Sequence, residues 1–156
     1  MPDPARHGGL RRRMVAWAAG LCLVSTAAQA QFTTVPAPAT VAATPSMAES
    51  APEYKRDVAR HLYAAYASRI FKGKLRPLLY GVMITETAID ADGHVLEVAV
   101  VRPPAAPEVG PWVVQLIKRA SPMPAPGRIG STRVLEIWLV DRSGQFQLDT
   151  LTEGQL

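Results

Sequence analysis

The stretch that most constrains the fold runs from Gly81 to Arg102 and reads GVMITETAIDADGHVLEVAVVR. Two runs rich in Val, Ile, Thr and Leu, which favour strands, lie on either side of Asp90-Ala91-Asp92-Gly93. Aspartate forms turns through its own side chain, and glycine adopts a positive φ at no steric cost. The pattern predicts an antiparallel hairpin with a short turn that closes at Gly93.

Helical periodicity precedes and follows the hairpin. Apolar residues recur every fourth position from Val58 to Ile70, and Ser50-Ala51-Pro52-Glu53 matches a capping box, so we expect a helix over about 51–71. A second apolar stripe with i, i+3, i+4 spacing, from Val109 to Ala120, predicts a second helix.

Two further strands are expected near the C-terminus. Residues 133–141 (RVLEIWLVD) form a third strand, and residues 145–151 (QFQLDTL) form a short fourth strand. The resulting order, α-β-β-α-β-β, predicts an α+β two-layer sandwich in which two helices cover an antiparallel sheet of three to four strands. We expect this domain to span residues 51–151, with residues 152–156 as a loose tail.

The first 30 residues have the three parts of a cleavable signal peptide. Arg11-Arg12-Arg13 provides the positive region, Met14 to Val24 the apolar region, and Ala28-Gln29-Ala30 an A-x-A cleavage signal. Cleavage there would leave Gln31 as the first residue of an exported, periplasmic protein. The alternative is an uncleaved inner-membrane anchor that extends to Ala30; only in that case would the protein contact a membrane through this segment.

A tether is expected between the signal and the domain. Residues 31–50 are rich in Pro, Ala and Thr and carry almost no charge. Pro36, Pro38 and Pro45 prevent a continuous helix, so we expect a disordered or partly polyproline segment.

Composition and charge exclude several classes. With 48% hydrophobic and 19% charged residues the chain is globular, and its formal charge of +4 falls to +1 beyond residue 30, because four of the 17 basic residues and one of the 13 acidic residues precede it. Nucleic acid is therefore not an expected partner. A local excess of basic residues between Glu53 and Arg76 is either a solvated helix face or a surface for anionic lipid or glycan. The only cysteine, Cys22, lies in the apolar N-terminal run, so the exported form has no thiol chemistry.

Catalytic and metal-binding signals are weak. His61 and His94 have no metal-type spacing around them, and Asp90 and Asp92 are explained by turn chemistry. Neither a phosphate-binding loop nor a nucleophile-elbow or dinucleotide-binding motif is present. We therefore expect a non-catalytic protein without cofactor or metal. A small periplasmic hydrolase that uses His61 or His94 with a nearby carboxylate is the alternative from another class.

Two stretches resemble the C-terminal domain of the TonB/TolA energy-transducer superfamily. One is the hairpin IDADGHV followed by Val98-x-Val100; the other is IKRASPMPAP (residues 117–126) before an apolar strand. The resemblance covers about residues 54–140. It implies a periplasmic binding domain that accepts an extended segment of an outer-membrane transporter as an added strand, chiefly at the strand corresponding to residues 133–141.

The expected partner-binding residues follow from this resemblance and from the alternation of side chains between the two faces of the third strand. If Leu135, Ile137 and Leu139 face the helices, the opposite face carries a surface for an envelope protein. We expect that surface, with the proline-rich exit before it, to consist of Val134, Glu136, Trp138, Val140, Pro122, Pro124 and Pro126. The alternative is that Trp138 is capped by the C-terminal segment.

Two features differ from an energy transducer. The apolar N-terminal run is short and ends in a cleavage signal, and the proline-containing tether is too brief to cross the periplasm. The expected function is therefore an exported binding or adaptor module that engages an envelope protein by strand addition. Its alternative is an anchored TonB-type energy transducer for outer-membrane transport. A fourth strand paired with the third could occupy the binding edge, and self-pairing there would give a homodimer.

Overall fold

The computed structural model describes residues 31–156. The expected signal peptide (residues 1–30), with its cleavage residues Ala28 and Ala30, lies outside the described residues, and Gln31 is the first of them.

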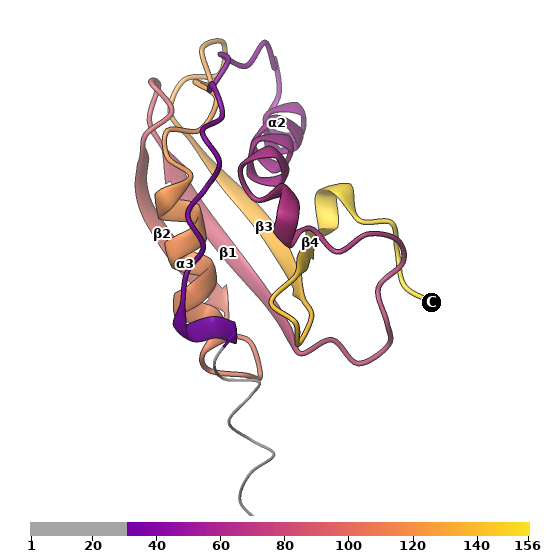
Figure 1. Cartoon of the computed structure of the whole chain (residues 1–156). Coiled ribbons are helices and arrows are strands. Elements are labelled where there is room, and N and C mark those ends of the chain that lie inside the picture. Colours follow the sequence, from indigo (N-terminus) through magenta and orange to yellow (C-terminus); the bar gives the residue numbers. More distant parts are fainter. Residues whose placement is uncertain (1–30) are drawn as a thin grey trace, which may run out of the picture.

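The described chain forms an antiparallel four-stranded sheet that is covered on one face by two helices (Figure 1). The strand order is β2-β1-β3-β4. In chain order the elements are α2 (Ala51–Ala65), η1 (Ala67–Arg69), β1 (Gly81–Ile89), β2 (Val95–Arg102), α3 (Val109–Arg119), β3 (Thr132–Val140), β4 (Phe146–Leu148) and η2 (Asp149–Leu151), where η denotes a 3₁₀ helix. The predicted α+β class and element order are confirmed.

The hairpin turn adopts the expected geometry. The amide of Gly93 donates to the carbonyl of Asp90 at 3.1 Å, and Gly93 has a φ of +92°. A β-carbon at this position would lie 2.1 Å from the carbonyl oxygen of Met123, whose own amide donates to the carbonyl of Gly93. Glycine is therefore required twice, once for the backbone angle and once for the approach of a second segment.

The core lies between the helices and the inner face of the sheet. Burial alternates along β1, with Met83, Thr85, Thr87 and Ile89 facing inward. Aromatic rings fill the centre: the ring centroids of Trp138 and Phe146 are 5.0 Å apart, and Trp112 meets Phe146 edge-on at 6.4 Å. Such rings bury large apolar areas and stabilise the two layers against each other.

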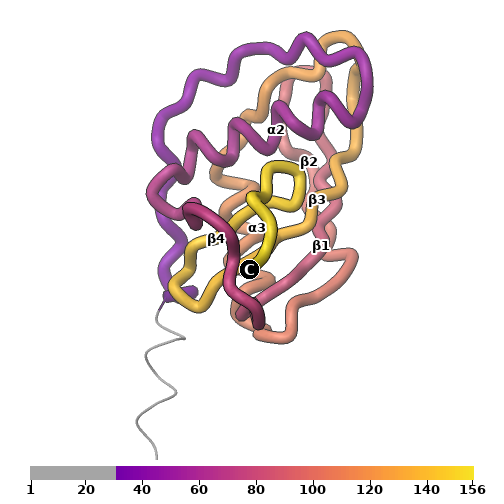
Figure 2. The backbone as a smooth tube through the Cα atoms, turned by 90° about the vertical axis from the view of Figure 1, so that its right-hand side faces the viewer, coloured from indigo at the N-terminus to yellow at the C-terminus, as the bar shows by residue number. Residues whose placement is uncertain are grey.

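Residues 31–50, called the N-terminal strap below, lie against the domain instead of forming a separate tether (Figure 2). The amide of Ala39 donates to the carbonyl of Ala65 at 2.8 Å, and that of Ser46 to the carbonyl of Ala125 at 3.0 Å. Phe32 is only 6% exposed. Only residues 31–33 of the strap are helical, so the prolines prevent a continuous helix as predicted. The remaining backbone keeps free amides that can bond to neighbouring segments.

Two element boundaries differ from the prediction. The first helix ends at Ala65 rather than near residue 71, because Tyr66 leaves the helical region at φ −123° and η1 follows. The fourth strand has only three residues and turns into η2. The last residues, expected to be loose, are tied to the loop after η1: Leu75 donates its amide to Gly154 and accepts from the amide of Leu156.

Candidate partner-binding edge

The side chains predicted to form a partner-binding surface on β3 are buried in the core. Val134 and Glu136 are 5% exposed, and Trp138 and Val140 are fully buried beneath the helices. The prediction of an exposed surface here is corrected, because the residues of the other face, Leu135, Ile137 and Leu139, point away from the helices.

The proline-rich exit is also mostly buried. Pro122 is exposed, whereas Pro124 and Pro126 are buried. The hydroxyl of Tyr54 donates to the carbonyl of Pro124 at 2.8 Å, which fixes the exit against α2. These residues hold α2 and the hairpin turn in place and offer only Pro122 to a partner.

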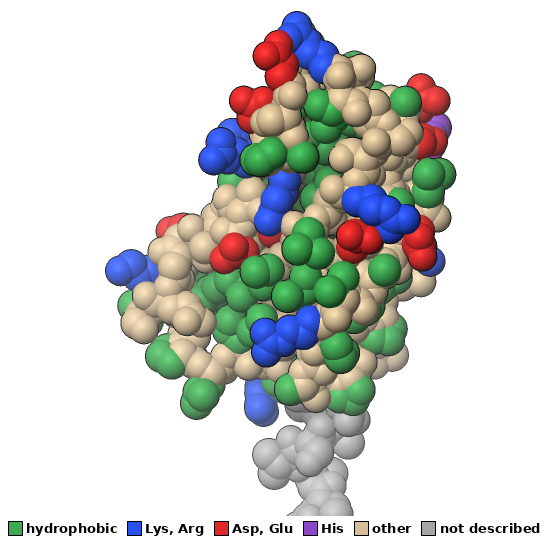
Figure 3. Space-filling model, turned by 180° about the vertical axis from the view of Figure 1, so that it is seen from behind, with side chains coloured by type: hydrophobic (Ala, Val, Ile, Leu, Met, Phe, Trp, Pro, Cys, Tyr) green, Lys and Arg blue, Asp and Glu red, His purple; other side chains and the backbone are tan. Residues whose placement is uncertain are grey.

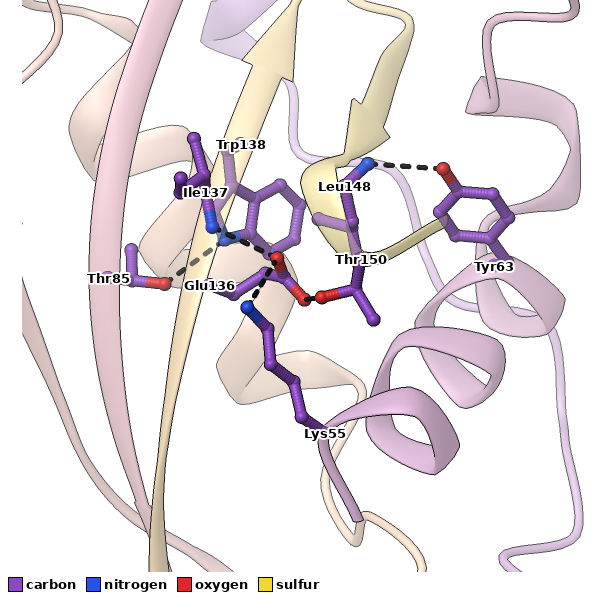
Figure 4. A network of polar contacts seen from close by, with 8 residues as sticks. All are labelled: Lys55, Tyr63, Thr85, Glu136, Ile137, Trp138, Leu148 and Thr150. Carbon is purple, nitrogen blue, oxygen red and sulfur yellow. Dashed lines mark hydrogen bonds and ion pairs between the residues drawn. The ribbon is translucent and has the colours of Figure 1, made fainter. Parts of the chain in front are cut away.

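The outer edge of β3 is occupied by the chain itself at its C-terminal end. β4 pairs with the last three residues of β3, Trp138 to Val140. At the next edge position, where β4 has ended, the amide of Ile137 donates to a carboxylate oxygen of Glu136 at 3.0 Å (Figure 4). Six residues of β3, Thr132 to Ile137, have no strand partner on this side.

Glu136 is the centre of a buried polar network that links three elements (Figure 4). Its second carboxylate oxygen, Oε2, accepts from the hydroxyl of Thr150 in η2 at 2.7 Å. The ammonium of Lys55 in α2 lies 3.6 Å from the first, Oε1, which also accepts from the amide of Ile137. Nearby, the amide of Leu148 donates to the hydroxyl of Tyr63 at 3.1 Å. Burial raises the pKa of Glu136 above its ordinary value, and these hydrogen bonds and Lys55 oppose that rise.

The outer edge of β2 is the longer open edge of the sheet. No strand of residues 31–156 pairs with it. Only its first residue is engaged, since the amide of Val95 donates to the hydroxyl of Ser121 at 3.1 Å. From Leu96 to Arg102 the outer edge has no partner strand in the described part of the chain, which is the situation in which a sheet accepts another strand.

Two bulges define the regular part of this edge. β2 has one extra residue at each end of its pairing with β1, so that Leu96 and Val101 have no partner in the register. Bulges bend a strand and limit pairing from outside. The four residues between them, Glu97 to Val100, keep a regular register with β1.

The direction of the backbone groups on β2 follows from the register. The amide of Ile137 points away from β1, so Ile137 and its partner Ile84 form a pair without backbone hydrogen bonds. The amide and carbonyl of Ile84 therefore point towards β2. Those of Glu86, two residues further along β1, point the same way. Glu86 pairs with Ala99. The residues on either side of Ala99, Val98 and Val100, therefore present their amides and carbonyls to the open edge.

An uncharged groove lies beside this edge, between β2 and the start of α3. The lining residues are mostly proline and valine: Val100, Pro103, Pro104, Pro107, Gly110, Pro111, Val114 and Gln115. In the sequence these prolines indicate only the end of a strand and the start of a helix. Their role as the wall of a groove depends on how α3 packs beside β2.

The residues considered for catalysis have other partners. The imidazole of His61 contacts the carbonyl of Ala120 at 2.9 Å in a buried position. At the hairpin turn one carboxylate oxygen of Asp90 accepts from the amides of Asp92 and His94, and these backbone hydrogen bonds lower the pKa of Asp90. Ligand atoms of Asp90, Asp92 and His94 lie within 4.8 Å of one another on the surface, but the turn itself accounts for this grouping.

Part of the predicted basic face is neutralised. Lys55 approaches Glu136, and Arg60 forms an ion pair of 3.0 Å with Asp57. The stretch between Glu53 and Arg76, which includes α2 and the loop after η1, is therefore less basic than its sequence suggests.

Within residues 31–156, no helix is both long enough and apolar enough for a membrane crossing. Comparison with protein-family models, curated protein sequences and solved structures finds no match to this chain.

Proposed function

We propose that this chain is an exported, periplasmic binding module without catalytic activity, which accepts an extended segment of an envelope protein as a fifth strand along β2. The observation that carries the proposal is the open outer edge of β2 beside an uncharged groove. The resemblance of residues 54–140 to TonB/TolA C-terminal domains supports strand addition as the mode of binding. The edge of β3 is partly occupied, by β4 at residues 138–140 and by the Glu136 carboxylate at Ile137, and this favours β2 over the strand that the resemblance alone indicates.

The recognition would combine backbone and side-chain contacts. An added strand would form hydrogen bonds with Val98 and Val100, whose backbone groups face the edge. Its alternate side chains would point towards the groove beside Pro111 and Val114. Because the groove carries no charge, the segment that fits has small or branched apolar side chains at every second position.

Site-specific photocrosslinking in exporting cells tests the proposal. A photoreactive residue at Gln115, which is exposed in the groove, should capture an envelope protein. The same residue at Met47, which is 68% exposed and follows Ser46, whose amide bonds to Ala125 near the hairpin turn, is the matched control and should not capture it. Equal capture from both positions would show that the groove gives no selectivity.

Val100→Pro separates strand addition from mere proximity. Proline removes an amide that faces the open edge and leaves the hydrogen bonds between β1 and β2 in place. We expect the variant to fold, with a Tm near that of the wild type, and to lose the capture from Gln115. Undiminished capture by a folded variant would contradict strand addition at β2.

The site of export processing is tested separately. N-terminal sequencing of the protein recovered from cells should begin at Gln31. A chain that keeps residues 1–30 and stays in the inner membrane would favour the anchored energy transducer.

A further inference from the structure

The side chains of β2 lie in two rows, one on each face of the sheet. Val98 and Val100 form the row on the helix side, because their partners in β1, Thr87 and Thr85, are buried beneath the helices. A strand added to β2 would follow the same alternation, since side chains directly opposite each other lie on the same face. The residues opposite Val98 and Val100 would therefore point towards the helices and the groove.

The second row of β2 lies on the open face of the sheet and is charged at both ends. It consists of Glu97, Ala99 and Arg102, whose partners in β1 are the half-buried positions that alternate with the buried ones. Figure 3 shows the molecule from this side, where charged side chains of both signs lie among apolar ones. Within β2 itself no charged residue lies between Glu97 and Arg102.

The charges at the two ends of this row are available to a partner. Glu97 has only a long ion pair, of 3.9 Å, with Arg133, and its side chain is 63% exposed. Arg133 lies closer, at 2.7 Å, to Glu86, the residue of β1 opposite Ala99, so it mainly neutralises Glu86. Arg102 is exposed and forms no ion pair within residues 31–156.

We propose that the segment added along β2 runs antiparallel to it and carries five residues in the order acidic, apolar, unspecified, apolar, basic. The inference rests on the strand addition proposed above and names the segment that this edge selects. The acidic residue, which comes first, lies opposite Arg102, and the basic residue, which comes last, lies opposite Glu97. The apolar residues lie opposite Val100 and Val98. Val101 is the extra residue of the bulge, so Arg102 continues the outward row after Ala99.

The pairing geometry favours contact between these charges. The backbone groups of Val98 and Val100 face the open edge, so these two residues form the hydrogen-bonded pairs with the added strand. Glu97 and Ala99 then form pairs without backbone hydrogen bonds, in which the side chains lie closer together. Opposite charges at such positions attract and like charges repel. The residue opposite Ala99 meets only a methyl group, which is why it is unspecified.

The order of the charges also determines the direction of the segment. The same segment bound parallel to β2 would place its acidic residue opposite Glu97 and its basic residue opposite Arg102, and both pairs would repel. Glu86 is the nearest other charge of the open face in the register. It lies in β1, on the far side of β2 from the added strand, and its carboxylate is paired with Arg133.

Two fluorescently labelled peptides of the same composition test the inference by fluorescence anisotropy, with the chain purified from exporting cells. The forward peptide contains Asp-Val-Thr-Val-Lys and the reversed peptide Lys-Val-Thr-Val-Asp, each flanked by threonines and blocked at both ends. We expect the forward peptide to bind about tenfold more tightly, because two attractive cross-strand pairs replace two repulsive ones.

The double variant Glu97→Lys with Arg102→Glu keeps the net charge of the chain and should reverse the preference between the peptides. Val100→Pro should abolish the binding of both, because it removes an amide that faces the edge. Far-ultraviolet circular dichroism and Tm confirm that each variant is folded.

The outcomes separate this inference from the proposed function. Equal binding of the two peptides, lost in Val100→Pro, would retain strand addition at β2 and overturn the selection by charge. Tighter binding of the reversed peptide by the wild type, or a preference that the double variant does not reverse, would also overturn it. If neither peptide binds while a photoreactive residue at Gln115 still captures an envelope protein, only this inference is wrong; if that capture is absent too, the proposed function is wrong as well.

Discussion

The indole N–H of Trp138 donates a hydrogen bond of 3.1 Å to the hydroxyl of Thr85, and both residues are fully buried beneath the helices. Thr85→Val keeps the shape of the side chain but leaves the indole N–H without a partner. We expect the free energy of unfolding in urea to fall by about 1–3 kcal/mol, the cost of an unsatisfied buried donor. Thr85→Ser retains the hydroxyl. Its free energy of unfolding should therefore fall less than that of Thr85→Val, because the hydrogen bond to the indole remains.

Glu136 should make stability depend on pH. Its folded pKa lies above the ordinary 4.5 because the carboxyl is buried. The folded state therefore holds a proton that the unfolded state has released, and the free energy of unfolding decreases as pH rises from 4.5 through the raised pKa. Glu136→Gln cannot titrate, so this part of the pH dependence should disappear in urea unfolding measured across that range.

Glu86→Gln is the control for Glu136, because Glu86 lies on the open face of the same sheet. The control should keep the pH dependence that is lost in Glu136→Gln. If both variants follow the wild-type pH profile, the carboxyl of Glu136 does not cause the pH dependence of the free energy of unfolding.

Gly93→Ala should destabilise the hairpin. The positive φ costs an alanine about 1–2 kcal/mol, and the added carbon would overlap the carbonyl oxygen of Met123, so the loss in free energy of unfolding should exceed that figure. Gly127→Ala, whose added carbon meets nothing within 4 Å, should be close to neutral. Thermal and urea unfolding of the two variants provide the measurement.

Phe32 should anchor the N-terminal strap. Its ring stacks on Tyr80 at 5.5 Å and meets Trp112 edge-on at 5.2 Å. Phe32→Ala should cost about 3 kcal/mol, as expected for a buried aromatic residue. It should also speed hydrogen exchange of the Ala39 amide, which bonds to Ala65.

Met47→Ala, at a strap position that is 68% exposed, should change neither quantity. A tether that does not pack on the domain would instead make the two variants indistinguishable, with fast exchange at Ala39 in the wild type.

The hairpin and the second helix were predictable because local chemistry decides them. Asp90 and Gly93 specify the turn by themselves. The apolar residues from Val109 onward have i, i+3, i+4 spacing, which fits a helix and not a strand. The facing of β3 was not predictable, because Leu135, Ile137 and Leu139 form as apolar a row as Val134, Trp138 and Val140. The choice depends on distant partners, such as Thr85 for the indole and Thr150 for Glu136.

The open edge and its groove depend on the same kind of long-range information. Val100 and Pro111 are close in space only because α3 packs beside β2. The strap was missed for a related reason: its prolines indicate only that no continuous helix forms, whereas its hydrogen bonds to Ala65 and Ala125 are formed with residues far along the chain.

The packing of Phe32 has a consequence for the order of export processing and folding. If export processing cuts the chain after Ala30, the bond to be cut lies two residues before a ring that is held between Tyr80 and Trp112. A protease needs the residues on both sides of its target bond in an extended, accessible form. Cleavage would then have to precede the docking of this ring, and a chain that docks Phe32 first would be a poor substrate for the protease.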